Sequence, residues 1–268
     1  MDDSRSLVRR LRDAAFSRGL LIVPSALLFG LFAIPLLAIV IRSFGSGFLS
    51  NAISRQAFQA LSLSLVTSSI TTLIALVLGT PLAYLLARSR RGTWIELILD
   101  LPIVLPPSVA GLGLLIAFGR NGLLGGALGA LGVSLPFTTT AVVMAQTFVA
   151  APLYVRSARV GFRHVEPELI EAAHVEGANT WQLFREVMVP IAGRVLLSGA
   201  ILTWTRALGE FGATILFAGN LEGVTQTMPM AIYLGFERNL GVALSLAVVL
   251  IAVSVVLLAL SKRLETQS

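Results

Sequence analysis

Long apolar segments separated by short polar ones dominate the pattern of hydrophobic and polar positions along the chain. Most apolar segments are close to the roughly 20 helical residues that cross the ~30 Å hydrocarbon layer of a membrane, and the second is longer. The pattern therefore predicts an all-α integral membrane protein with six transmembrane helices. The predicted spans are Leu20–Ile41, Phe58–Ala87, Ile95–Gly119, Phe137–Val155, Val195–Phe217 and Val242–Leu260.

Composition supports a membrane protein over a soluble one. Of the 268 residues, 56% are hydrophobic and only 13% are charged, and the mean hydropathy is +0.86. Soluble domains are about one quarter charged, because their whole surface faces water. We therefore expect a multi-pass protein of the cell (inner) membrane.

The basic residues indicate the orientation. Fifteen of the 20 Lys and Arg residues lie at the N-terminus, after the second and fourth spans, and in the C-terminal tail, whereas four lie in the loops on the other side. Cytoplasmic loops hold the excess of basic residues, so both termini are predicted to be cytoplasmic. The net charge of +6 is spread over short loops, a pattern that does not predict nucleic-acid binding.

These features divide the chain into three parts. Residues 1–55 form a cytoplasmic N-terminal segment and the first span. Residues 56–261 form the main transmembrane domain, with a long cytoplasmic loop at residues 156–194. Residues 262–268 form a cytoplasmic tail.

Several kinds of chemistry are excluded by residue content. The chain has no Cys and only two His residues, His164 and His174, which argues against a metal centre. An ATP-binding P-loop requires a lysine at the phosphates, and the single lysine is Lys262 in the tail. We therefore expect no catalytic residues, no metal and no cofactor bound by this chain.

The 156–194 loop has the pattern of two short helices. Pro167 suits a first helical turn, and Gly177 suits a helix end. Asn179 or Thr180 is a suitable cap for a second helix over Trp181–Met188.

The same loop resembles a known signature. Glu171, Ala172 and Ala173, then Gly177 after three residues and Pro190 at the end match the EAA motif of permease subunits of binding-protein-dependent ABC importers. In that family the segment would be the coupling helix that docks on an ATPase. The alternative is an amphipathic helix that merely lies on the membrane surface.

Other segments are similar to the molybdate, tungstate and sulfate branch of that family. They are Gly79–Tyr84, Asp100–Pro102, Arg206–Thr214 and Thr225–Tyr233.

The resemblance implies a type I ABC importer transmembrane fold that moves an oxyanion, with molybdate favoured over sulfate or tungstate. It also implies a second copy of the permease, two cytoplasmic ATPase subunits that use ATP and Mg, and an extracytoplasmic solute-binding protein.

Two sets of residues inside the spans are candidates for the translocation pathway. Arg206 and Glu210 are four residues apart, so they are predicted to pair on one face of the fifth helix. The pair either borders the passage or simply neutralises itself in a packed interface. Pro102, Pro106 and Pro107 interrupt the third span and predict a hinge or a cavity wall.

Two other classes of function remain as alternatives. A self-sufficient secondary transporter typically contains inverted repeats, and the sequence shows no internal repeat. An intramembrane enzyme needs a nucleophile with a base, and no His lies in a predicted span.

Overall fold

The computed structural model describes residues 2–44, 47–89 and 93–266, which form helices joined by turns and loops. Arg90 and Arg91, which contribute to the charge asymmetry, lie outside the described residues. In chain order the helices are α1 (Asp2–Ser43), α2 (Phe48–Ala52), α3 (Arg55–Arg88), α4 (Thr93–Val104), α5 (Pro107–Phe118), α6 (Gly125–Ala130), α7 (Thr139–Arg163), α8 (Pro167–Val175), α9 (Thr180–Gln182), the π-helix η1 (Leu183–Met188), α10 (Val189–Leu208), α11 (Gly212–Ala218), α12 (Met228–Arg238) and α13 (Leu240–Thr266).

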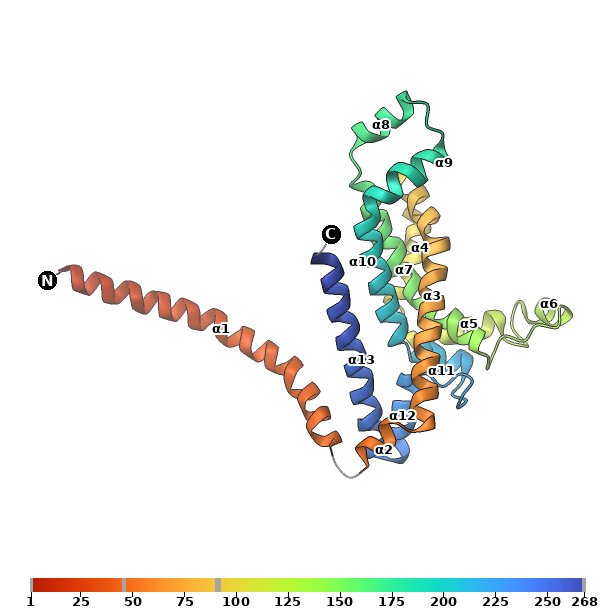
Figure 1. Cartoon of the computed structure of the whole chain (residues 1–268), viewed down its shortest axis with the longest axis horizontal. Coiled ribbons are helices and arrows are strands. Elements are labelled where there is room, and N and C mark those ends of the chain that lie inside the picture. Colours follow the sequence, from red (N-terminus) through yellow and green to blue (C-terminus); the bar gives the residue numbers. More distant parts are fainter. Residues whose placement is uncertain (1, 45–46, 90–92, 267–268) are drawn as a thin grey trace.

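Helices α3, α7 and α10 form the centre of the bundle, and α13 runs beside them (Figure 1). Small residues let the central helices approach closely. A Cβ atom added at Gly199 of α10 would lie 2.8 Å from the Cβ of Ser157 on α7, which is too close for a side chain. Because lipid is as apolar as the helices, this close packing, rather than exclusion of water, drives their association.

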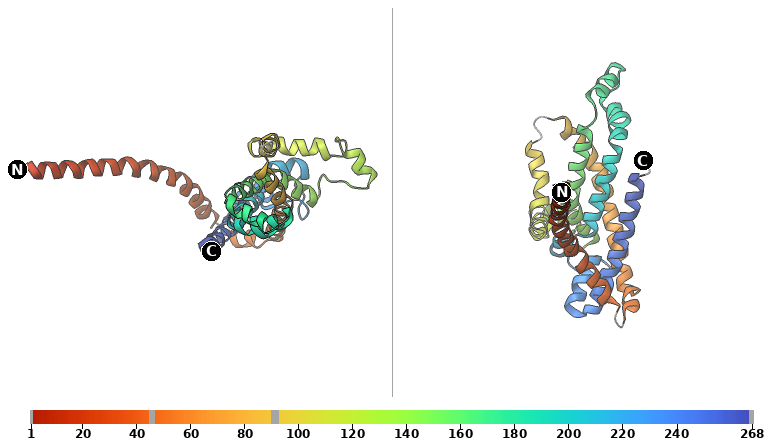
Figure 2. Two further views of the ribbon diagram at one scale, coloured as in Figure 1. Left: turned by 90° about the horizontal axis from the view of Figure 1, so that it is seen from above. Right: turned by 90° about the vertical axis from the view of Figure 1, so that its left-hand side faces the viewer.

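Two parts stand away from the bundle (Figures 1 and 2). Helix α1 extends to one side. In its apolar part, Leu21–Ser43, no residue of the most hydrophobic stretch is buried. Helix α5 packs on α11 and α7 and leads to α6, which projects toward the opposite side.

The all-α membrane fold expected from the sequence is confirmed. Five helices in the described residues are long and apolar enough to cross a membrane, and there are six if the bent pair α4 and α5 counts as one span. The third predicted span is therefore not one straight helix, because the chain bends by 116° between α4 and α5.

The predicted end of the fifth span is wrong, and the helix that contains the fourth span is longer than predicted. Helix α7 continues to Arg163, well beyond the expected end at Val155, because a helix that leaves the lipid keeps its own backbone hydrogen bonds. The fifth span ends at Leu208 rather than Phe217. Much of the expected 156–194 loop is therefore helical extension of its two neighbours.

Pro190 does not separate the short loop helix from the fifth span. Helices α9, η1 and α10 run on as one apolar span from Thr180 to Leu208. Proline lacks an N–H group and clashes with the carbonyl four residues earlier in an α-helix. The π-helical turn at Leu183–Met188 directly precedes Pro190. Its wider spacing of hydrogen bonds accommodates the missing N–H of the proline.

Single cysteines in this cysteine-free chain test the orientation. Glu222 lies in the exposed loop between α11 and α12, whereas Ser89 and Glu176 lie near the ends of α3 and α8. We expect an impermeant thiol reagent to label Glu222→Cys from outside intact cells, and to label Ser89→Cys and Glu176→Cys only after permeabilisation. Reversed labelling at any two of these sites contradicts cytoplasmic termini.

Candidate functional site

Helix α8 begins and ends with well-defined signals. Pro167 occupies its first turn, where the missing N–H is not needed. At the other end Gly177 has φ +82°, and its N–H donates to the carbonyl of His174 at 3.0 Å, while Ala178 N–H donates to Ala173 at 2.9 Å. This pair of bonds is a Schellman motif, which fixes the direction in which the chain leaves the helix.

The next helix is capped by its own side chains. The Asn179 side chain accepts from Gln182 N–H at 2.9 Å, and the Gln182 side chain accepts from Asn179 N–H at 2.9 Å. This capping box confirms the start that the sequence predicted for the second helix.

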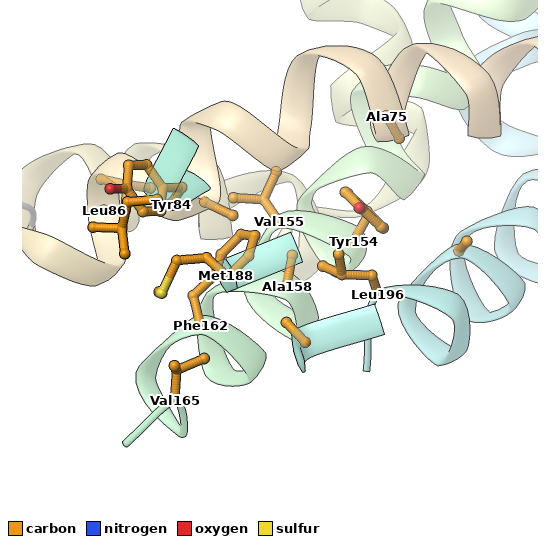
Figure 3. Close-up of a cluster of buried hydrophobic side chains, with 14 residues drawn as sticks. Ala75, Tyr84, Leu86, Tyr154, Val155, Ala158, Phe162, Val165, Met188 and Leu196 are labelled. Carbon is orange, nitrogen blue, oxygen red and sulfur yellow. The ribbon is translucent and has the colours of Figure 1, made fainter. Parts of the chain in front are cut away.

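An aromatic cluster fastens this loop to the bundle. Phe184 of η1 packs on Tyr84 of α3, with ring centroids 5.1 Å apart, and on Phe162 of α7 at 6.3 Å. Figure 3 shows Tyr84, Phe162 and Met188 among the buried side chains of this region. This contact was not predicted from the sequence, where Tyr84 appeared only as the end of the Gly79–Tyr84 segment and Phe162 and Phe184 were not singled out. Aromatic residues near the ends of three segments were the available signal.

The outward side of the loop carries exposed apolar side chains. Val175 is 86% exposed and Trp181 is 63% exposed. Apolar side chains of this size on a polar loop are typical of a protein contact surface.

The five residues of the motif fall around this surface. Glu171 and Ala172 are exposed, while Ala173 packs against the buried core. Gly177 ends α8, and Pro190 lies across the loop in the first turn of α10.

The second candidate region is the bend between α4 and α5. Pro102 lies within α4 and is buried, Pro106 caps α5, and Pro107 is its first residue. Pro102 also lines an apolar cavity of about 290 Å³ between α3, α4 and α7. The expected interruption by these prolines is therefore present.

A second break lies directly beside the first. Helix α10 ends at Leu208 and α11 begins at Gly212. A Cβ atom at Gly212 would lie 2.7 Å from the Cβ of Pro107, and one at Gly111 would lie 2.6 Å from the carbonyl oxygen of Ala213. The backbones of the two interrupted spans are thus in direct contact. Such breaks are tolerated in membranes where protein or water forms hydrogen bonds with the freed N–H and C=O groups.

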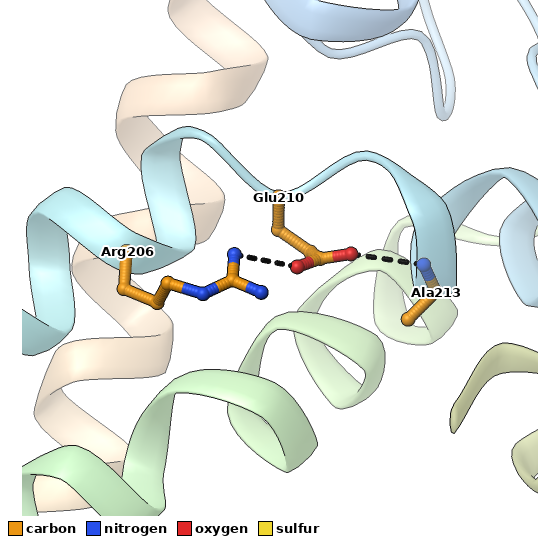
Figure 4. A network of polar contacts seen from close by, with 3 residues as sticks. All are labelled: Arg206, Glu210 and Ala213. Carbon is orange, nitrogen blue, oxygen red and sulfur yellow. Dashed lines mark hydrogen bonds and ion pairs between the residues drawn. The ribbon is translucent and has the colours of Figure 1, made fainter. Parts of the chain in front are cut away.

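Arg206 and Glu210 flank the second break (Figure 4). Nη1 of Arg206 lies 2.6 Å from Oε2 of Glu210, and Oε1 of Glu210 accepts a hydrogen bond from Ala213 N–H at 2.9 Å. The predicted pairing is present, but the two residues do not share one helix, because Glu210 follows the end of α10. The carboxylate instead joins the end of α10 to the start of α11.

The polar residues of α3 face protein. Thr71 donates toward Oε1 of Gln146 on α7 at 3.2 Å, and Ser64 accepts from Met228 N–H at 2.7 Å. Both hydroxyl residues are fully buried, so they serve helix contacts. Among the described residues no group of three His, Cys, Asp or Glu side chains is placed to hold a metal ion.

Comparison with known sequences gives consistent matches. The family described as binding-protein-dependent transport system inner membrane component matches residues 75–266. The chain is 42% identical over 229 residues to the molybdenum transport system permease protein ModB of Mycobacterium tuberculosis, covering 84% of this chain and 87% of that protein. It is 37% identical over 239 residues to the probable transport system permease protein NifC of Clostridium pasteurianum, covering 88% and 84%.

A more distant relative and a solved structure complete the comparison. The sulfate transport system permease protein CysW of Synechococcus elongatus is 32% identical over 241 residues, covering 88% of this chain and 84% of that protein. A bacterial alginate ABC transporter in complex with an alginate pentasaccharide-bound periplasmic protein contains a chain of similar fold, with a TM-score of 0.77 at 16% identity, covering 96% of this chain and 95% of that one.

Proposed function

The chain belongs to the inner-membrane components of binding-protein-dependent transport systems, and from that premise we propose that it forms the path by which molybdate enters the cell. It is an ABC importer permease, a translocation subunit rather than an enzyme, and it resides in the inner membrane. The observation that carries the molybdate proposal is the 42% identity to a molybdenum permease.

The substrate class follows from the relatives and from charge. Molybdate, tungstate and sulfate are tetrahedral dianions that differ mainly in size, and the related permeases carry names for molybdenum and for sulfate. Sulfate or tungstate is therefore the second candidate for the same passage. In an importer of this type the tight choice among such anions belongs to the soluble binding protein.

We propose that the working assembly holds two copies of this chain, two cytoplasmic ATPase subunits and one extracytoplasmic binding protein. The ATPase partner would bind and use ATP and Mg, because this chain has no P-loop. Residues 1–55 would add the first span to a core transmembrane domain of residues 56–261, and residues 262–268 would be a short cytoplasmic tail.

Coupling to the ATPase is assigned to α8 and its flanking turns. Val175 and Trp181 offer exposed apolar contacts, and Glu171 is an exposed charge at the middle of α8. The aromatic contacts of Phe184 connect this surface to α3 and α7. A displacement of α8 is therefore transmitted through packed side chains rather than absorbed by a loose loop.

The passage itself is assigned to the two interrupted spans, with Pro102, Pro106, Pro107, Arg206 and Glu210 beside it. The Arg206 side chain is 33% exposed in a single copy. A charge at membrane depth faces water or protein rather than lipid. Arg206 is therefore expected to border a wet passage at the contact with the second copy.

The coupling assignment predicts the effect of changes at Gly177. A Cβ atom there meets nothing within 4 Å, so only the positive φ of +82° opposes a side chain. Gly177→Val forces a β-branched residue into this region at a cost of about 1–3 kcal/mol and breaks the helix end. We expect loss of ATPase copurification and of uptake.

Gly177→Asn is the matched control, since Asn tolerates left-handed backbone angles. It should retain most ATPase association. Normal ATPase association and full uptake by a well-expressed Gly177→Val protein would show that α8 is not the coupling element.

The substrate proposal is tested on the cognate binding protein by isothermal titration with molybdate, tungstate and sulfate. We expect molybdate to bind and sulfate to fail to displace it at physiological concentration. If the binding protein binds sulfate tightly and gives no heat with molybdate, the molybdate proposal is wrong and sulfate is the substrate.

A further inference from the structure

The two members of the Arg206 and Glu210 pair differ sharply in exposure. The side chain of Arg206 is 33% exposed, whereas that of Glu210 is 1% exposed. The pair therefore presents its cation outward and keeps its anion inside the protein.

The hydrogen bonds of the two groups also differ. Both oxygens of the Glu210 carboxylate have partners, one on Arg206 and one on the backbone N–H of Ala213. A guanidinium has five N–H donors, and within the described residues only Nη1 of Arg206 has a protein acceptor. Arg206 thus offers unused donors on its exposed side.

No other charged residue lies in the neighbouring stretches of α10, α3 and α7. Arg206 and Glu210 are the only charged residues between Arg194 and Glu222. The packed helices add none, because residues 56–87 of α3 and residues 139–155 of α7 contain no Asp, Glu, Lys or Arg. Within these stretches the pair is the only source of formal charge.

The site lies at the middle of the bundle. Nε1 of Trp204, two residues before Arg206, donates to the hydroxyl of Ser69 at 3.2 Å. Ser69 lies near the centre of the 34-residue helix α3. The free donors are therefore placed midway along α3, the longest of the central helices.

We propose that Arg206 is an exchange site for a tetrahedral oxyanion, with Glu210 as a built-in competitor, a role that rests on the proposed import function. The passing dianion takes the free donors of Arg206 and weakens the bond to Glu210. The carboxylate keeps its bond to Ala213 N–H, so it stays in place and repels the anion. The anion is held briefly and released.

This arrangement suits a passage rather than a storage site. A lone arginine attracts a dianion more strongly than an arginine with a carboxylate beside it, because nothing offsets the Coulomb attraction. The Glu210 carboxylate, whose Oε2 lies 2.6 Å from Nη1 of Arg206, offsets much of that attraction. Glu210 is thus a positioning residue that keeps the affinity of Arg206 for the anion low.

The test is equilibrium binding of radiolabelled molybdate and sulfate to the purified permease and ATPase complex without binding protein. The wild-type complex should bind both anions weakly. In Glu210→Gln the amide oxygen can still accept from Ala213 N–H while the competing charge is gone, so we expect at least about a tenfold gain in affinity. Arg206→Gln alone should abolish the weak binding, and combined with Glu210→Gln it should abolish the gain in affinity.

Glu210→Asp provides a second variant in case Glu210→Gln does not assemble. The shorter carboxylate can still cap α11 but reaches Arg206 poorly, so a smaller gain in anion affinity is expected. Unchanged binding in whichever assembled variant is measured, or a gain that survives Arg206→Gln, overturns the exchange site.

Uptake by the wild-type complex with its binding protein separates this result from the broader function. If molybdate is imported but Glu210 variants gain no affinity, the exchange site is wrong and the import function stands. If neither anion is imported or bound, both proposals fail.

Discussion

The hydrocarbon interior of a membrane leaves no water to satisfy backbone N–H and C=O groups, and this constraint shapes the chain at its two broken spans. The bend of 116° between α4 and α5 and the break between α10 and α11 both free backbone groups. They meet at glycines, where Gly111 allows close approach to Ala213. Glu210 then accepts from the freed Ala213 N–H. The Glu210 carboxylate, which joins the two sides of the break, also forms the ion pair with Arg206.

The cytoplasmic surface and the mid-membrane break lie on one continuous element. Residues Thr180 to Leu208 form a single apolar span that begins at the capped turn after α8 and ends beside Glu210. Phe184 ties the start of this span to α3 and α7. In the proposed coupling role, a movement of α8 would reach Arg206 through the side chains packed around Phe184 and then along this helix.

Local patterns were enough to predict much of this arrangement. The apolar segments, the end of α8 at Gly177 and the cap at Asn179 depend on neighbouring residues, and the structure agrees with them. The break after Leu208 was missed because apolar residues continue on both sides of it. Glu210 looked like a helix-face partner by spacing alone, whereas its bond to Ala213 N–H arises from the break. The aromatic cluster and helix α12 depend on contacts between distant segments, which periodicity does not encode.

The central claim is that Arg206 and Glu210 border the passage rather than pin a packed interface. ATP-driven uptake by the purified complex in liposomes, measured with the binding protein present, tests it most directly. We predict that Arg206→Gln assembles normally but transports poorly, and that adding Glu210→Gln does not restore transport, because the attracting cation is still missing. A structural pair behaves differently, since removing both charges relieves the cost of leaving one unpaired. Full transport by the double variant would contradict the account.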